Sequence, residues 1–148
     1  YIPLPHRLAD TRIGTHLFID DSISTTPEAT EAALAAYPHA RIALIAGGYE
    51  RQQDYAHLAE RIGRTDTVAL VVRLPDTGAR LAGDLGQRAP NVTCLEAPDL
   101  ASAMQMIATR RQMVDTVILS PGAPSYNQFR NFGERGDAFI ALARQLFG

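Results

Sequence analysis

Three segments of the sequence combine residue types that bind small anions. The first holds two carboxylates followed by four hydroxyl side chains: Asp20, Asp21, Ser22, Ser24, Thr25 and Thr26. A second segment contains Arg51, and a third contains Ser125 and Tyr126 within a polar, aromatic run. Hydroxyls, free N–H groups at the start of a helix and a guanidinium all bind carboxylate or phosphate. The sequence therefore predicts a binding site for a small anion.

Simpler alternatives exist for parts of this pattern. Capping of the helix that follows Thr26 accounts for one or two of the hydroxyls, but not for the whole cluster. Arg51 could clamp a carboxylate through two parallel hydrogen bonds, or it could be an ordinary solvated surface residue. Asp20 and Asp21 are adjacent at the end of a strand, so their side chains point in opposite directions. They are not expected to act as a paired acid and base.

Several kinds of chemistry are excluded by what the sequence lacks. All 14 basic residues are arginine, so the chain has no lysine for a P-loop, a Schiff base or general-base catalysis. Gly47-Gly48 lacks the spacing of a dinucleotide-binding loop and is expected to form a tight turn at the end of a strand. No histidine has a partner at ligand spacing, and neither Ser120 nor Ser125 has an evident base. We therefore expect neither a zinc site nor a hydrolase triad.

The composition indicates one domain that works in the cytoplasm. The 148 residues are 46% hydrophobic, which is enough for a sizeable core. No apolar run reaches the length of a membrane span, so no membrane partner is expected. The net charge of -2 and the lack of a basic cluster argue against a nucleic-acid partner. The single cysteine, Cys94, cannot form an internal disulfide and is expected to be a buried thiol in a reducing compartment.

Strand patterns and helix patterns alternate along the chain. Strands are expected at 15–20, 41–46, 67–74, 92–95 and 115–119. Helices are expected at 27–37, 55–64, 75–85, 100–111 and 137–147, with Gly63 ending the second of them. This alternation predicts an α/β fold: a three-layer, Rossmann-like, mostly parallel sheet with helices on both faces. The loops that follow the strands then share one edge of the sheet, where open α/β sheets bind their ligands.

Residues 1–14 are expected to be an interdomain linker with a possible first edge strand. Two prolines within the first five residues favour a linker. A turn at 12–14 would join the segments 7–11 and 15–20 as a hairpin. Residues 15–148 then form the domain itself.

The strongest resemblance to a known family lies in Leu119-Ser-Pro-Gly-Ala-Pro-Ser-Tyr-Asn-Gln-Phe-Arg-Asn-Phe-Gly-Glu-Arg-Gly-Asp-Ala-Phe139. This run closely resembles a signature of the UDP-N-acetylmuramoyl-L-alanine–glutamate ligases, the MurD branch of the Mur ligases. That signature reads Leu-Ser-Pro, small residues, Ser, then Gln-Phe-x-x-Phe and an Arg-Gly pair. Asp20-Asp-Ser-Ile-Ser-Thr-Thr-Pro27, Glu31-Ala-Ala-Leu34 and Leu4-Pro-His-Arg7 also match, in the same order. The resemblance covers only the carboxy-terminal domain of such a ligase.

This resemblance implies a reaction. Such a ligase adds glutamate to UDP-N-acetylmuramoyl-L-alanine in peptidoglycan precursor synthesis, using ATP and Mg²⁺ and passing through an acyl phosphate. Its carboxy-terminal domain binds the incoming glutamate and closes over ATP, while ATP and Mg²⁺ are held mainly by a central domain. The partners of residues 15–148 would then be glutamate, UDP-N-acetylmuramoyl-L-alanine, ATP and the central domain. The lysine-free sequence agrees with this, and the chain alone is expected to be an inactive fragment.

The resemblance also implies roles for individual residues. The glutamate-binding positions are Thr25, Arg51, Ser125, Tyr126 and Phe132. The positions near the nucleotide after closure are His6, Arg7 and Asp21. No catalytic residue and no metal ligand is expected in this chain.

Two departures from the family pattern concern the carboxylate clamp. Arg51 stands where the family often has a lysine that contacts the side-chain carboxylate of glutamate. Ile23 stands where some members have a second lysine. The acceptor is therefore D-glutamate, the usual substrate, or L-glutamate, the substrate of a related branch. The alternatives from other classes are a non-catalytic α/β module that binds a small anion and a partner-docking domain.

Overall fold

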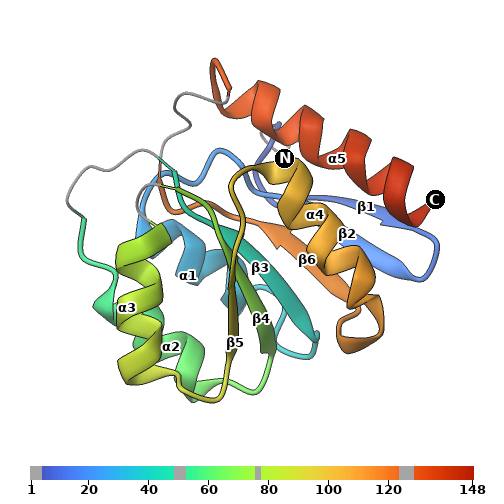
Figure 1. Cartoon of the computed structure of the whole chain (residues 1–148). Helices are drawn as coiled ribbons and strands as arrows, with labels where there is room; N and C mark the ends of the chain where they lie inside the picture. The colour runs from blue at the N-terminus through green and yellow to red at the C-terminus, as the bar shows by residue number, and fades with distance from the viewer. Residues whose placement is uncertain (1–4, 49–52, 76–77, 124–128) are drawn as a thin grey trace.

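A computed structural model describes residues 5–48, 53–75, 78–123 and 129–148 of the chain. Within these ranges a six-stranded sheet has the order β1-β2-β6-β3-β4-β5 (Figure 1). The strands are β1 Ala9–Ile13, β2 His16–Asp20, β3 Ile42–Ala46, β4 Val68–Arg73, β5 Thr93–Glu96 and β6 Thr116–Leu119. β1 and β2 pair antiparallel, and all the other pairs are parallel. The predicted α/β fold with a mostly parallel sheet is confirmed.

Helices cover both faces of this sheet (Figure 1). They are α1 Pro27–Ala35, α2 Ala56–Arg64, α3 Gly78–Arg88, α4 Leu100–Thr109 and α5 Phe132–Phe147, with a short 3-10 turn, η1, at Arg111–Met113. Successive residues of β6 point to opposite faces. Val117 and Leu119 pack in the core that α4 and α5 cover, and Ile118 packs in the core that α1, α2 and α3 cover. None of the helices in the described ranges is long and apolar enough to cross a membrane.

Burial of β6 on both faces explains why its short apolar run is a reliable strand signal. All four of its residues are buried. Burial of each of its apolar side chains, Val117, Ile118 and Leu119, contributes about 1.5–3 kcal/mol to folding.

The predicted hairpin at the start of the chain is present, with a later turn. Ile13 pairs with His16, so the turn consists of Gly14 and Thr15 rather than residues 12–14. Gly14 has a φ of 61°, a left-handed conformation that glycine adopts without strain. The glycine therefore determines where the turn forms.

α1 begins as the sequence predicts. The Thr26 side chain accepts a hydrogen bond from Ala29 N at 3.2 Å, and Pro27 is the first helical residue. The helix ends at Ala35, two residues before its predicted end at Tyr37.

α2 ends at Arg64, the predicted last residue, directly after Gly63. A Cβ at Gly63 would collide with the Arg88 carbonyl, so this glycine also allows α2 to approach the end of α3. The helix that was expected to start at Pro75 begins at Gly78 instead and continues past residue 85 to Arg88. Leu74 N donates to Ala46 O at 2.8 Å, so backbone pairing with β3 continues up to the residue before Pro75.

α5 begins five residues before its predicted start, at Phe132 rather than Asp137. The Asn131 side chain accepts a hydrogen bond from Glu134 N at 2.9 Å and caps the helix. Residues 132–136, which were expected to precede the helix, are therefore its first residues. This extension brings Phe132 and Arg135 onto a rigid element.

The strand register brings three strand ends to the same level. Leu119 of β6 is level with Asp20 of β2 and with Ile45 of β3. Beyond the strands, Asp21 N donates to Leu119 O at 2.9 Å and Ser120 N donates to Ile45 O at 3.2 Å. The loops after β2, β3 and β6 therefore leave the sheet side by side.

Candidate functional site

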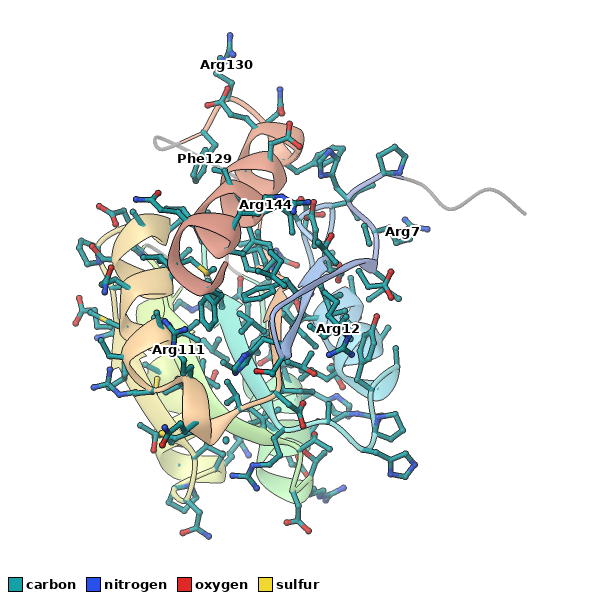
Figure 2. All side chains as sticks on the ribbon, turned by 90° about the vertical axis from the view of Figure 1, so that its right-hand side faces the viewer. Arg7, Arg12, Arg111, Phe129, Arg130 and Arg144 are labelled. Atoms are coloured by element: carbon teal, nitrogen blue, oxygen red, sulfur yellow. The ribbon has the colours of Figure 1, made fainter. Side chains whose placement is uncertain are left out.

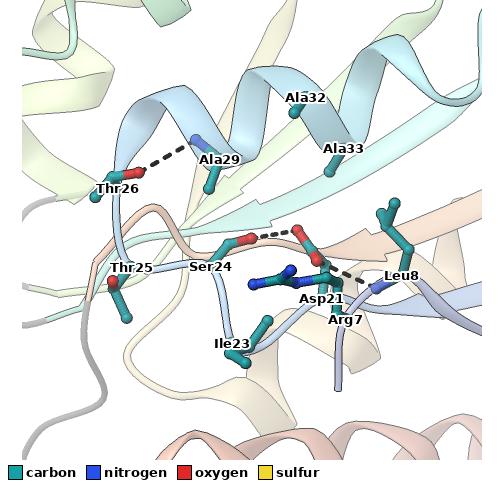
Figure 3. Close-up of a pocket in the computed structure, with 10 residues that line it drawn as sticks. All are labelled: Arg7, Leu8, Asp21, Ile23, Ser24, Thr25, Thr26, Ala29, Ala32 and Ala33. Atoms are coloured by element: carbon teal, nitrogen blue, oxygen red, sulfur yellow. Dashed lines mark hydrogen bonds between the residues drawn. The ribbon is translucent and has the colours of Figure 1, made fainter. Parts of the chain in front are cut away.

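Asp21 joins three segments at the carboxyl ends of β2 and β6. Its Oδ1 accepts a hydrogen bond from Leu8 N at 3.2 Å, and its Oδ2 accepts one from Ser120 Oγ at 2.8 Å. Ser24 Oγ also donates to Oδ2 (Figure 3). Burial raises the pKa of Asp21, and the hydrogen bonds from Ser24 and Ser120 oppose that rise. This carboxylate holds residues 6–8, the segment before β1 that is called the linker below, against the loops after β2 and β6.

His6 ties the linker to β2 and faces the start of α5. Its Nδ1 lies 2.6 Å from Asp20 Oδ2, and its carbonyl accepts a hydrogen bond from Ile23 N at 3.1 Å. Its ring meets the Phe132 ring edge-on, with centroids 6.0 Å apart. His6 and Leu8 have φ values of 62° and 47°, which are unfavourable for residues other than glycine. The surrounding hydrogen bonds therefore hold the linker in a conformation that its own sequence disfavours.

A hollow of about 370 Å³ lies between the linker and α1. Its lining consists of Arg7, Leu8, Asp21, Ile23, Ser24, Thr25, Thr26, Ala29, Ala32 and Ala33 (Figure 3). The three alanines leave one wall without bulky side chains. The opposite wall carries a guanidinium, a carboxylate and hydroxyls. A guanidinium beside hydroxyl groups suits an anionic ligand.

The four hydroxyls of residues 22–26 have different roles. Thr26 caps α1, and Ser24 donates to Asp21. Ser22 Oγ is buried without a hydrogen-bond partner among the described residues. Thr25 lines the hollow, and its carbonyl accepts a hydrogen bond from Gln53 Nε2 at 2.9 Å. Helix capping therefore accounts for Thr26 alone.

The turn after β6 is fixed by contacts with α1 and with the loop after β3. Thr30 Oγ1 donates to Ser120 O at 3.0 Å, and Gly47 N donates to Pro121 O at 2.8 Å. Gly122 has a φ of 67°, and a Cβ there would lie 3.0 Å from Thr30 Oγ1. Gly47 has a φ of 118° and also lies against another backbone segment. Both glycines are required by close approach. The tight turn expected at Gly47-Gly48 stays a prediction, because residues 49–52 lie outside the described ranges.

Arg135 is a buried cation in the first turns of α5. Only 2% of its surface is exposed. Its Nη2 donates to Ser22 O at 2.7 Å, and its Nη1 donates to Ala123 O at 3.3 Å. Burial lowers the pKa of Arg135 to about 10, and the negative charge of Asp20 opposes this shift. The guanidinium therefore stays charged at neutral pH and bridges the loops after β2 and β6.

A comparison with protein families matches residues 6–123 to the family described as Mur ligase, glutamate ligase domain. The match covers most of the chain. It includes β2 and β6, the loop that follows β2 and the turn that follows β6. The chain belongs to this family.

Curated relatives of this Mur ligase domain extend the match to nearly all of its residues. The UDP-N-acetylmuramoyl-L-alanine–L-glutamate ligase of Salinispora tropica is 35% identical over 146 residues, which is 98% of this chain and 32% of the relative. The UDP-N-acetylmuramoylalanine–D-glutamate ligase of Rubrobacter xylanophilus is 36% identical over 140 residues, which is 94% of this chain and 31% of the relative. The chain thus spans about a third of the length of these relatives.

Solved structures have the same fold at low sequence identity. The MurF ligase of Thermotoga maritima, solved in complex with ADP, aligns with a TM-score of 0.65 at 16% identity, covering 98% of this chain and 32% of that one. The folylpolyglutamate synthase of Thermotoga maritima aligns with a TM-score of 0.60 at 14% identity, covering 97% and 31%.

The structure brings together the described part of the predicted site of this Mur ligase domain in two groups. Arg7, Asp21 and Thr25 line the hollow. His6 and Phe132 are in ring contact on the other side of the linker, and Phe132 is 38% exposed. Arg51, Ser125 and Tyr126 lie outside the described residues, so their predicted roles stay predictions.

Residues that the sequence left without a role complete the site. Arg135 lies in the run 119–139 that resembles the glutamate-ligase signature, but nothing in its spacing indicated burial. Tyr55 is buried, its hydroxyl donates to Gly122 O at 3.3 Å, and the Arg80 guanidinium lies 5.5 Å from its ring centroid. A glycine directly after Arg135 was the one available signal, because it indicates that the backbone of α5 approaches another segment.

No group of three or more His, Cys, Asp or Glu side chains that could hold a metal ion occurs among the residues that the structure describes. Cys94 on β5 is half-buried rather than fully buried, and burial raises the pKa of its thiol.

Proposed function

We propose that this chain is the glutamate-binding, carboxy-terminal domain of an ATP-dependent ligase that adds glutamate to UDP-N-acetylmuramoyl-L-alanine in the cytoplasm. The observation that carries the proposal is the coincidence of two features. Relatives that match almost the whole chain are named as ligases of this substrate and glutamate. The loop after β2, which holds Asp21 and Thr25, lines a hollow at the carboxyl end of that strand, where open α/β sheets bind ligands.

The reaction has two steps in this proposal. The carboxylate of UDP-N-acetylmuramoyl-L-alanine takes the γ-phosphoryl group of ATP, which gives an acyl phosphate and ADP. The amine of glutamate then attacks the acyl carbon, the amide C–N bond forms, and phosphate leaves as the amine loses its proton. The residues of this chain bind and orient glutamate so that its amine meets the acyl phosphate.

The proposed roles follow from the chemistry of the side chains. Thr25 and Ser125 offer hydroxyls, and Arg51 offers a two-point contact for the side-chain carboxylate of glutamate. Tyr126 and Phe132 would flank the aliphatic part of the amino acid. Roles near the nucleotide are proposed for His6, Arg7 and Asp21: Arg7 supplies the cation at the rim of the hollow, while His6 and Asp21 hold the linker.

ATP and Mg²⁺ are assigned to a central domain outside this chain. The chain contains no lysine for a P-loop, and the described residues offer no three-ligand metal group. In this proposal the residues of this chain bind glutamate, and the central domain binds the metal.

The acceptor is D- or L-glutamate, because relatives named for each enantiomer match this chain at similar identity. Competition between D- and L-glutamate in the full-length ligase decides between them.

The test replaces Arg51 in the full-length ligase. Arg51→Ala is expected to raise the glutamate KM more than about tenfold, or about 1.4 kcal/mol, because the side-chain carboxylate loses its clamp. Arg64→Ala is the matched control, since Arg64 is exposed on α2 and pairs with Glu60 of the same helix. An unchanged KM in Arg51→Ala would remove Arg51 from the site. ATP-dependent glutamate ligation by the 148-residue chain alone would refute its assignment as a binding domain.

A further inference from the structure

The pair Arg135-Gly136 lies in the run 119–139 that resembles the glutamate-ligase signature, but it has no role in the proposed glutamate site. Its position in the structure is unusual for a charged residue. Arg135 is 2% exposed, and its hydrogen-bond acceptors are two neutral carbonyls, Ser22 O and Ala123 O. Its Nε is buried without a hydrogen-bond partner among the described residues, and so is the neighbouring Ser22 Oγ.

This arrangement is unfavourable for stability alone. A cation in the first turns of a helix opposes the helix dipole, and its burial without a paired carboxylate is costly. No carboxylate of the described residues lies within 4.0 Å of the guanidinium, although the Asp20 charge acts on it from further away. Sites that break the usual rules of burial in this way are more often functional than structural.

We propose that Arg135 is a positioning residue that sets the spacing between the loop after β2 and the turn after β6, and thereby the affinity for glutamate. This inference rests on the proposed function. One guanidinium holds both segments: Ser22 lies three residues before Thr25, and Ala123 lies two residues before Ser125. The planar fork of arginine can bridge two carbonyls at once, whereas a lysine ammonium has no fixed fork.

Gly136 explains how α5 comes close enough for this bridge. A Cβ on Gly136 would collide with Asp20 Oδ2, His6 Nδ1 and Ser22 Oγ. The helix backbone therefore lies directly on this cluster, and any side chain at 136 would push Arg135 away from the two loops.

Ser22 is held from both sides by this network. Its carbonyl accepts from Arg135 Nη2, and its N–H donates to Asp20 Oδ1 at 3.1 Å. Asp20 in turn contacts His6 at 2.6 Å. The first loop is therefore fixed to α5 and to the linker before any ligand arrives, which reduces the ordering that binding would require.

The test uses Arg135→Lys and Arg135→Gln in the full-length ligase. Lysine keeps the charge but not the bridge, and glutamine removes the charge as well. If Arg135 acts by positioning, both variants raise the glutamate KM about tenfold or more, while the ATP KM changes less than about twofold. Arg144→Gln, an exposed residue in the last turn of α5, is the control and leaves both constants unchanged (Figure 2).

A second readout does not depend on the substrate. Amide hydrogen exchange of residues 22–26 is expected to be about tenfold faster in both Arg135 variants than in the Arg144→Gln control, because local opening becomes easier. A normal glutamate KM in Arg135→Lys would overturn the positioning role and would indicate that only the charge matters. Unchanged exchange in both variants, or failure of both to fold, would overturn it as well.

The outcomes distinguish failure of the positioning role from failure of the proposed function. If the wild-type ligase does not use glutamate, the proposed function fails, and the exchange measurement still decides whether Arg135 fixes the loops. If the wild type uses glutamate and the variants do so equally well, only the positioning role is wrong.

Discussion

Buried polar groups at the two ends of the parallel strands differ in whether they have hydrogen-bond partners. At the amino end, the buried residues His16 and Thr116 both have partners: His16 Nε2 lies 2.8 Å from Arg111 O, and Thr116 Oγ1 donates to Asp115 Oδ1 at 2.8 Å. At the carboxyl end, Ser22 Oγ and Arg135 Nε are buried with no hydrogen-bond partner among the described residues.

This difference separates residues that serve folding from residues that serve binding. Buried polar groups are nearly always paired in native structures, because an unpaired one costs about 1–3 kcal/mol. The amino end follows that rule within the described ranges. The carboxyl end departs from it beside the proposed glutamate site, so changes there should affect activity more than stability.

The largest effect is expected from Asp21→Ala at the carboxyl end. The change removes the acceptor for Leu8 N, Ser24 and Ser120, which frees the linker and both loops. We expect kcat/KM of the full-length ligase to fall about 100-fold, or about 2.7 kcal/mol. The free energy of unfolding should fall by about 1 kcal/mol, a smaller change, because donors such as Ser24 lose a buried acceptor while the cost of burying the carboxylate is relieved. Urea unfolding and steady-state kinetics measure both, and a large stability loss with normal kcat/KM would break the comparison.

A smaller effect, on stability and not on activity, is expected from Asp115→Ala at the amino end. Asp115 Oδ1 accepts hydrogen bonds from Arg41 N at 3.0 Å and from Thr116 Oγ1 at 2.8 Å. Their loss should lower the free energy of unfolding by about 1 kcal/mol and leave kcat/KM unchanged. Reduced activity in a variant that is folded at the assay temperature would contradict the division between the two ends.

The smallest effect is expected from the exposed pair of His57 on α2 and Glu31 on α1. His57 Nδ1 lies 2.7 Å from Glu31 Oε1, and this hydrogen bond raises the pKa of His57. The pair therefore stabilises the fold fully below the unfolded histidine pKa of about 6.5 and loses that contribution as the pH rises through the raised folded pKa.

The measurement is the difference in melting temperature between wild type and His57→Gln across that pH range. A small difference at low pH that disappears at high pH is expected, because the histidine side chain is 78% exposed. Activity should not change. A difference that grows with pH would contradict the sign of this linkage.

The fold was predictable because its signals are local. The apolar run of β6, the Thr26-Pro27 start of α1 and the glycine of the first turn each determine their element from neighbouring residues. The errors are helix starts: α3 begins at Gly78 rather than Pro75, and α5 begins at Phe132 rather than Asp137. The close contact of Gly63 with α3 could not be predicted either, because it involves residues distant in the sequence. The start of α5 did have a local signal that the prediction missed: Asn131 is a helix-capping residue directly before Phe132.

The site was predictable only in part. Hydroxyls, Asp21 and Arg7 were identified from residue type and from resemblance, and the structure gathers them around one hollow. The bridge made by Arg135 could not be predicted, because it joins positions 113 residues apart in the sequence. The contact of His6 with Phe132 likewise depends on the unusual backbone of the linker.

The two outer strands of the sheet have a consequence for association between copies of this chain. β1 exposes Asp10 and Arg12, and β5 is only four residues long, with Glu96 paired to Arg73 at 2.7 Å. Charged or very short outer strands are poor templates for adding a further strand. Neither edge strand therefore favours pairing with a strand from another copy, which protects the chain from aggregation through its sheet edges.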